Sequence, residues 1–214
     1  MMKDLTAVAV LFLSVCSSAA TTRTAETVPD LVIADFESLD EWRGLELDRQ
    51  QFKEGRASGL WHKMPERSGV ATLTFPHDWS RHSAVSFWMH NARKVDAAFM
   101  LILRSENPAS DGDDYYSLKL RLDRWTGWRR LVVPFCEFGA AREPLGWDRI
   151  ERIDFTASGW DNQPHPEAEV RFDDFRVLAI DRVTGPLMSD EELFDALDLA
   201  RPDMAAVKQA VDRS

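Results

Sequence analysis

Between residues 31 and 180 the sequence alternates apolar and polar residues over short runs, the period of β-strands with one buried face. In the run 115–122, Tyr116 and the leucines at every second position after it alternate with more polar residues. Gly, Pro, Asn or Asp separates the runs, as at turns between strands. This pattern predicts strands near residues 31–37, 46–52, 57–63, 70–75, 83–90, 97–104, 115–122, 127–135, 149–157 and 168–178. Short strands without a helix predict an all-β fold, a β-sandwich of the jelly-roll type.

The last predicted strand changes phase in its middle. Val170 and Phe172 share one face, and burial resumes at Phe175, one residue out of step. A β-bulge at Asp173-Asp174 would explain the slip. Two carboxylates beside a core strand need a cation or hydrogen-bond donors, because an unpaired buried charge is costly.

The first predicted strand has the same character, because Asp35 and Glu37 are expected on one face and Phe36 on the other. Carboxylate oxygens suit Ca²⁺ better than zinc or softer metals, and carbonyls of the turn 51–59 would complete a coordination shell. The alternative is that these acids are solvated or paired with nearby arginines. The sequence thus predicts a Ca²⁺ clamp between the chain's first and last strands, with the ligands Asp35, Glu37, Asp173 and Asp174.

The net charge of −10 argues against nonspecific nucleic-acid binding and against a membrane-surface role. Residues 1–20 read as a secretory signal peptide whose apolar run is too short to span a bilayer. We therefore expect an exported protein, periplasmic or extracellular, with a linker over 21–30. Lipoprotein anchoring through Cys16 is the alternative.

The pattern of short alternating runs ends at about residue 182. A capping box at Ser189–Glu192 and a proline at 202 predict a short helical tail over 181–214. Such a tail docks on the β-domain, stays loose, or belongs to a further domain.

Five short motifs occur in the order typical of a known family. They are Ala34-Asp-Phe-Glu37, Lys53-Glu-Gly55 with Ser58-Gly-Leu-Trp61, Thr126-Gly-Trp-Arg-Arg-Leu131, Gly146-Trp-Asp-Arg-Ile150 and Phe172-Asp-Asp-Phe175. Over 31–180 the chain thus resembles the galactose-binding-like β-jelly-roll carbohydrate-binding modules. The resemblance implies noncatalytic polysaccharide binding and a structural Ca²⁺ held by Asp35, Glu37 and Asp173, with Asp174 as a further candidate.

The segment Leu187–Lys208 is similar to the one that precedes the α/α-toroid of heparinase II/III-like polysaccharide lyases. None of the toroid's catalytic groups is in this chain. This similarity implies an accessory module of an exported polysaccharide-degrading system, with a lyase catalytic domain as a partner and a uronic-acid polysaccharide as a candidate ligand. On this view 181–214 is the start of a truncated lyase domain.

Modules of this kind bind sugars on exposed aromatic faces, with polar groups nearby for the hydroxyls. Trp88 and His90 lie on the more polar side of their strand, and Trp160 lies in a polar loop. The candidate ligand-binding residues are Trp88, His90, Trp160, Trp61 and Trp125, and each also has a structural interpretation. Trp128, Trp147 and Cys136 are expected in the core. A basic cluster of Lys119, Arg121, Arg124 and Arg129 is interpreted either as a contact for uronate or sulfate or as a solvated face with ion pairs.

The sequence has no nucleophile elbow, no phosphate loop and no Cys/His pair, so we expect no enzyme. Two further interpretations remain open. One is a structural domain that packs on a lyase toroid or a partner protein, and the other is a small β-sandwich lyase.

Overall fold

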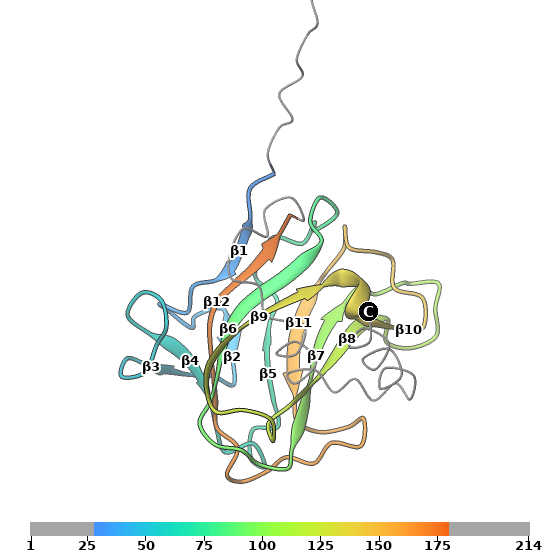
Figure 1. Cartoon of the computed structure of the whole chain (residues 1–214). Helices are drawn as coiled ribbons and strands as arrows, with labels where there is room; N and C mark the ends of the chain where they lie inside the picture. Colours follow the sequence, from blue (N-terminus) through green and yellow to red (C-terminus); the bar gives the residue numbers. More distant parts are fainter. Residues whose placement is uncertain (1–27, 180–214) are drawn as a thin grey trace, which may run out of the picture.

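A computed structural model describes residues 28–179, which form a sandwich of two antiparallel β-sheets (Figure 1). Sheet A contains, in spatial order, β3 (Glu46–Asp48), β4 (Ser58–Trp61), β12 (Val170–Leu178), β6 (Ala84–Asn91) and β9 (Gly127–Pro134), and β1 (Leu31–Ala34) also pairs with β12. Sheet B contains β10 (Gly139–Ala141), β8 (Tyr115–Arg121), β7 (Ala98–Arg104), β11 (Arg152–Thr156), β5 (Gly69–Thr72) and β2 (Trp42–Arg43). One 3₁₀ turn, η1 (Phe135–Glu137), follows β9.

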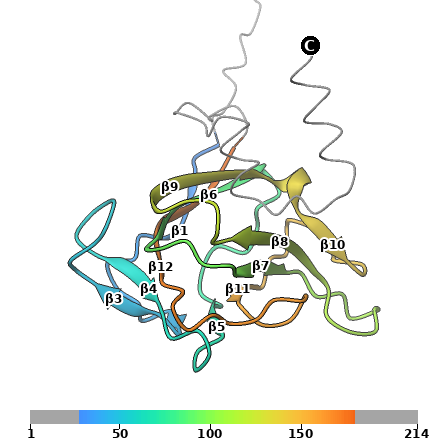
Figure 2. The same ribbon diagram turned by 60° about the horizontal axis from the view of Figure 1, so that its bottom comes forward.

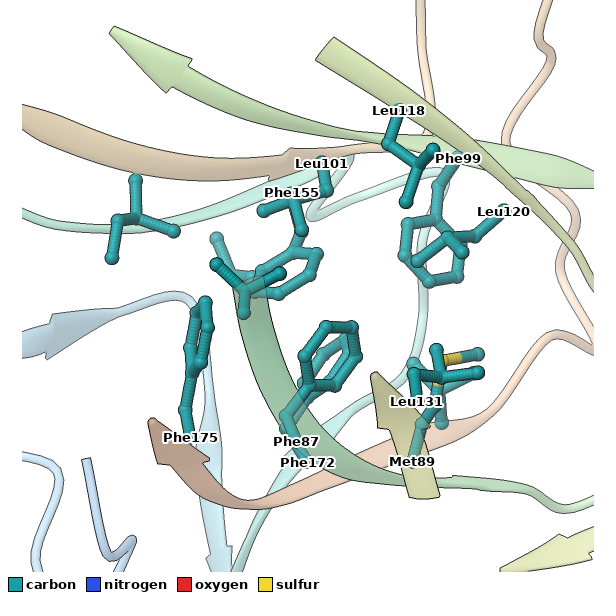
Figure 3. Close-up of a cluster of buried hydrophobic side chains, with 14 of the residues drawn as sticks. Phe87, Met89, Phe99, Leu101, Leu118, Leu120, Leu131, Phe155, Phe172 and Phe175 are labelled. Atoms are coloured by element: carbon teal, nitrogen blue, oxygen red, sulfur yellow. The ribbon is translucent and has the colours of Figure 1, made fainter. Parts of the chain in front are cut away.

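The core lies between the two sheets and is rich in aromatic rings (Figure 3). At its centre Phe155 of β11 stacks on Phe172 of β12, with 4.3 Å between the ring centroids. Phe87 and Phe99 meet this pair edge-on. These rings are fully buried, and each sits where the alternation of its strand points inward. The sheets are therefore held together by residues that the sequence pattern placed on the apolar faces.

The structure confirms the all-β sandwich. It adds two edge strands of sheet B, β2 and β10, which have two and three residues and are too short to show a period in the sequence. The predicted signal peptide and helical tail lie outside the described residues. Within residues 28–179 there is no helix long and apolar enough to cross a membrane.

The bulge in the last strand is confirmed. Asp173 pairs with Trp88 and Arg176 with Ser86, and the register shifts between them. Asp174, inside this shift, has a φ of 45°.

At the other end of the chain one expectation is wrong. β1 ends at Ala34, and Phe36 has a φ of 57°, so residues 35–37 form a turn instead of a strand. Phe36 is still buried, because the turn folds its ring into the core.

Candidate functional site

A recess lies on the outer face of sheet B, on the side away from the core. It has a volume of about 460 Å³, and we call it the sheet B cleft. The lining residues that matter below are Arg43, Arg104, Arg152, Asp154, Thr156 and Trp160. They come from three strands and one loop, β2, β7, β11 and the loop after β11.

Strand alternation places the polar side chains of the cleft. In β11, Ile153 and Phe155 enter the core, so Arg152, Asp154 and Thr156 point outward. Arg152 lies directly across from Arg104 of β7 in the ladder. Residues opposite one another on one face approach to about 4.5–5.5 Å between Cβ atoms.

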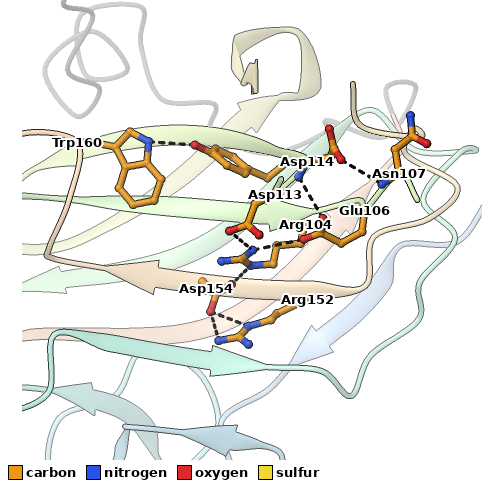
Figure 4. Close-up of polar contacts among 9 residues, drawn as sticks. Arg104, Glu106, Asn107, Asp113, Asp114, Arg152, Asp154 and Trp160 are labelled. Atoms are coloured by element: carbon orange, nitrogen blue, oxygen red, sulfur yellow. Dashed lines mark hydrogen bonds and ion pairs between the residues drawn. The ribbon is translucent and has the colours of Figure 1, made fainter. Parts of the chain in front are cut away.

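An ion-pair network holds the floor of the cleft (Figure 4). Arg104 Nε lies 3.0 Å from Asp154 Oδ2, and Arg152 Nη2 lies 2.6 Å from Asp154 Oδ1. A second group of acids, Asp113 and Glu106, contacts Arg104 Nη1 at 3.0 and 3.3 Å. Burial alone would lower the pKa of Arg104, but the hydrogen bonds to Asp113 and Asp154 outweigh it and raise that pKa above its usual range. Arg104 is therefore a fixed, charged donor.

Trp160 supplies the aromatic surface. Its side chain is 43% exposed, and its Nε1 donates to the Tyr115 hydroxyl at 3.2 Å. The two rings meet edge-on with 5.9 Å between centroids. Trp160 and Asp161 both have positive φ, in a tight turn closed by a bridge between Gly159 and Asn162. The turn presents the indole to solvent, and Tyr115 fixes its orientation.

One acidic residue from the first segment of the domain, Glu37, and one from the last, Asp173, bond the same turn, 53–56. Asp173, fully buried, accepts hydrogen bonds at Oδ2 from the backbone N–H groups of Lys53 (2.7 Å) and Glu54 (2.9 Å). Glu37 Oε1 accepts one from Arg56 N at 2.6 Å. Burial raises the pKa of Asp173 even though these donors oppose the shift. The first and last segments of the domain are thus tied together through this turn.

Two of the four predicted metal ligands point elsewhere. Asp174 Oδ1 lies 2.6 Å from Arg176 Nε. Asp35 is exposed and accepts the N–H of Glu37 at Oδ1. Over residues 28–179 no three His, Cys, Asp or Glu side chains converge as a metal site.

Comparison with solved structures finds the same fold in a carbohydrate-binding module. A family 30 carbohydrate-binding module aligns with 71% of this chain and 99% of its own, at 12% identity and a TM-score of 0.53. The family 11 module of the cellulosomal cellulase Lic26A-Cel5E of Clostridium thermocellum aligns with 72% of this chain and 96% of its own, at 16% identity and a TM-score of 0.49. The likeness is one of fold. No protein-family profile and no curated protein sequence matches this chain.

The predicted ligand-binding residues do not form one site. Trp160 lies in the sheet B cleft and is exposed, as its loop position predicted. Trp88 and His90 belong to β6, and they face outward from sheet A, on the opposite side of the sandwich. The structure therefore separates them from Trp160 by the thickness of the core.

Two of the candidates are corrected to core residues. Trp61 has no exposed surface, packs edge-on against Phe99, and donates from Nε1 to the Arg67 carbonyl at 2.7 Å. Trp125 is 2% exposed, because the turn that carries it folds back onto the end of the core. Neither ring offers a face to a sugar.

Three residues expected in the core lie outside it or at its margin. Leu131 and Val133 of β9 point inward, so Trp128 and Arg130, on the alternate positions of the strand, point outward. Trp147 is half-buried and stacks on Phe135 at 3.8 Å between centroids. Cys136 is exposed in η1, because the 3₁₀ turn breaks the strand period.

The basic cluster is largely paired, which favours its interpretation as a solvated face. Arg121 contacts Asp123 at 2.9 Å and Arg124 contacts the same carboxylate at 3.5 Å. Arg129 points the other way, with its guanidinium 5.7 Å from the Trp125 ring centroid.

Sequence reasoning missed the polar floor of the cleft. Arg104, Arg152 and Asp154 occupy ordinary outward positions of predicted strands. Arg104 lies 50 residues before its partner Asp154, so the sequence alone does not indicate their contact. The available signal was Arg152-Ile-Asp154, a charged pair on one face of a strand whose other face is apolar.

Proposed function

We propose that this domain binds a polysaccharide, without cleaving it, in the sheet B cleft. The observation that supports the proposal is the exposed Trp160 ring next to the network around Asp154. An indole face stacks on the apolar C–H face of a pyranose, and fixed polar groups beside it bond the hydroxyls. Trp160 would supply the stacking, and Arg104, Arg152 and Thr156 the hydrogen bonds.

The two arginines on the floor of the cleft are already paired, which favours a neutral sugar beside them; Arg43, the third arginine of the lining, lies on the edge strand β2 and is exposed. The cations Arg104 and Arg152 both bond Asp154, and Arg104 also bonds Asp113. Guanidinium groups already paired with carboxylates have little to gain from a uronate, whereas their remaining N–H groups and the acceptor oxygens suit hydroxyls.

Binding without cleavage agrees with the same network. Glycoside hydrolysis uses two carboxyl groups that flank the bond. Among the described residues that line the cleft, Asp154 is the one carboxylate, and two guanidinium groups hold it.

The test is affinity electrophoresis in gels that contain neutral polysaccharides, followed by calorimetry with the best ligand. Trp160→Ala is expected to weaken binding at least tenfold, about 1.4 kcal/mol, because the stacking surface is lost. Leu145→Ala is a matched control, since Leu145 is similarly exposed at 40% and lies outside the cleft. Equal affinity of wild type and Trp160→Ala, or no binding to any glycan, would contradict the proposal. In the second case the packing-domain interpretation gains support.

We infer that the setting is an exported polysaccharide-degrading system, with a lyase domain as a candidate partner. The support is the signal-peptide pattern of residues 1–20 and the resemblance of 187–208 to the segment that precedes the toroid of heparinase II/III-like lyases. Detection of the mature protein in a periplasmic or culture fraction, with the N-terminus near residue 21, tests the export.

We also propose a structural Ca²⁺ at the turn 53–56, held by fewer side chains than the predicted clamp of four ligands. Asp173 Oδ1 is buried and has no hydrogen-bond partner among residues 28–179, so one oxygen is left for a cation. Glu37 lies against the same turn so closely that a Cβ at Gly55 would clash with its Oε1. Asp173 and Glu37 would hold the ion together with backbone and water oxygens, the ligands that Ca²⁺ accepts. The ion would offset the cost of burying the Asp173 charge.

Thermal unfolding in excess Ca²⁺ and in EDTA tests this site. At a concentration a hundred times Kd, an ion bound only to the folded state adds about 2.7 kcal/mol, or roughly 5–10 °C in Tm for a domain of this size. The shift should vanish in Asp173→Asn and persist in Asp35→Asn, whose side chain is exposed. A wild-type Tm that Ca²⁺ and EDTA leave equal would rule the ion out.

A further inference from the structure

The outer face of sheet A carries a second group of aromatic and basic side chains, far from the cleft. Trp88 lies directly across from Arg130, and His90 lies directly across from Trp128, on the neighbouring strands β6 and β9. Figure 2 shows β6 and β9 in the layer opposite β7 and β8. Lys53 reaches the same place from the turn after β3. We call Lys53, Trp88, His90, Trp128 and Arg130 the sheet A patch.

The patch offers aromatic surface next to positive charge. Trp88 and Trp128 are half-buried, so each ring keeps an exposed part. Lys53 Nζ lies 4.5 Å from the centroid of the Trp88 ring. Such a cation–π contact at an exposed lysine is weak enough for a ligand to displace. The His90 and Trp128 rings meet at 5.2 Å between centroids.

The two cations of the patch have no carboxylate partner among the residues we describe. Arg130 Nε bonds the Ser86 hydroxyl at 3.0 Å, and Lys53 contacts the Trp88 ring. Next to the patch, directly across from His90 on β12, Arg171 shows the opposite case, because Asp48 and Glu169 both lie 2.8 Å from its guanidinium.

His90 adds no charge to the sheet A patch. Burial, and then the positive charge of Arg171, lower its pKa, so the ring is neutral at pH 7. Its Nε2 contacts the Gln51 side chain at 2.7 Å. In a chain of net charge −10, two cations without an ion pair lie here beside two indole rings, and the buried Asp173 lies directly across from Trp88 on β12.

We propose that the sheet A patch is a second binding site, for a carboxylate-bearing sugar unit such as a uronate. An indole ring stacks on the C–H face of a pyranose, and a guanidinium directly across the ladder is within reach of a carboxylate on that ring. Arginine suits this role because its planar fork bonds a carboxylate with two parallel N–H groups. Lys53 would leave its contact with the Trp88 ring and add a second positive charge near the carboxylate. The cleft and the patch would then select different sugars on opposite sides of one domain.

The experiment compares calorimetric titrations of the whole protein with an oligogalacturonate and with a neutral oligosaccharide of equal length. Arg130→Gln is expected to weaken oligogalacturonate binding at least about tenfold, because it removes the charged fork. Arg124→Gln, which makes the same charge change at an exposed arginine that is paired with Asp123 in the turn before β9, should change affinity less than about twofold. Trp88→Ala should also abolish binding, and Trp88→Phe should restore part of it if the ring is what matters.

The controls separate this site from the cleft. Trp160→Ala should leave oligogalacturonate binding intact, even if neutral glycans prove not to bind at all. The proposal is overturned if Arg130→Gln and Arg124→Gln behave alike, since the attraction would then be nonspecific. It is also overturned if Trp160→Ala removes uronate binding, which would assign that sugar to the cleft, or if a poly-glutamate peptide binds as tightly and independently of Trp88.

Discussion

Replacing Phe172 by alanine is expected to lower the free energy of unfolding by about 4 kcal/mol. Phe172 is 1% exposed and stacks on Phe155 of the other sheet, so its removal leaves a cavity between the two sheets. The neighbouring rings Phe87 and Phe99 lose their edge contacts with it as well. A domain of this size is stable by only about 5–15 kcal/mol, so the change removes a large part of the total. Equilibrium unfolding in guanidinium chloride measures it.

The matched control is Leu73→Ala, because Leu73 is 52% exposed and its loss should cost less than about 0.5 kcal/mol. If Phe172→Ala cost no more than Leu73→Ala, the ring stack would not be the centre of the core.

Replacing Asp173 by alanine is expected to cost between about 2 and 3 kcal/mol in the absence of Ca²⁺. The substitution leaves the N–H groups of Lys53 and Glu54 without their acceptor inside the protein, and it detaches the turn 53–56 from the last strand. Asparagine at the same position keeps a carbonyl acceptor and removes the buried charge, so it should cost much less. Asp35→Ala, on the exposed side of the cluster, is the control.

The pH dependence of the stability difference between wild type and Asp173→Asn gives the sign of the contribution of Asp173 to the free energy of unfolding. Burial raises the pKa of Asp173 in the folded state above its usual value of 3.8. Without a cation, its protonation adds stability that is fully present below pH 3.8 and is lost as the pH rises through the folded pKa. Asp173→Asn should therefore gain stability relative to wild type as the pH rises through that range. With Ca²⁺ bound to the carboxylate, the trend reverses. A difference that is flat with pH in both conditions would show that the carboxyl does not titrate on unfolding.

The fold was readable from the sequence because period-two alternation is a local property. Leu118 and Leu120 mark the inner face of β8, and the phase slip between Phe172 and Phe175 predicts the bulge from the sequence alone. The short strands β2 and β10 were not readable, since two or three residues carry no period.

Only part of the candidate sites could be predicted from the sequence, for a different reason. Alternation tells which residues of one strand share a face, but it does not tell which strands lie side by side. Trp88 and Trp160 looked equivalent as exposed aromatics, yet the topology sends them to opposite sides of the sandwich. For the same reason the ion pair between Arg104 and Asp154 could not be predicted, because it depends on the pairing of β7 with β11. Burial of a tryptophan in a turn, as at Trp125, depends on how the turn folds back and left no mark in the pattern.

The pairing of β1 with β12 has a mechanical consequence. Leu31 lies opposite Val177, so the described chain enters and leaves sheet A side by side. A pulling force between residues 28 and 179 would act across this ladder and open its hydrogen bonds one after another, as a zipper opens. Such a geometry resists load much less than strands sheared lengthwise, where all bonds must break together. The ties from the turn 53–56 to Glu37 and Asp173 lie just beyond the ladder, and they would be the first firm obstacle to that opening.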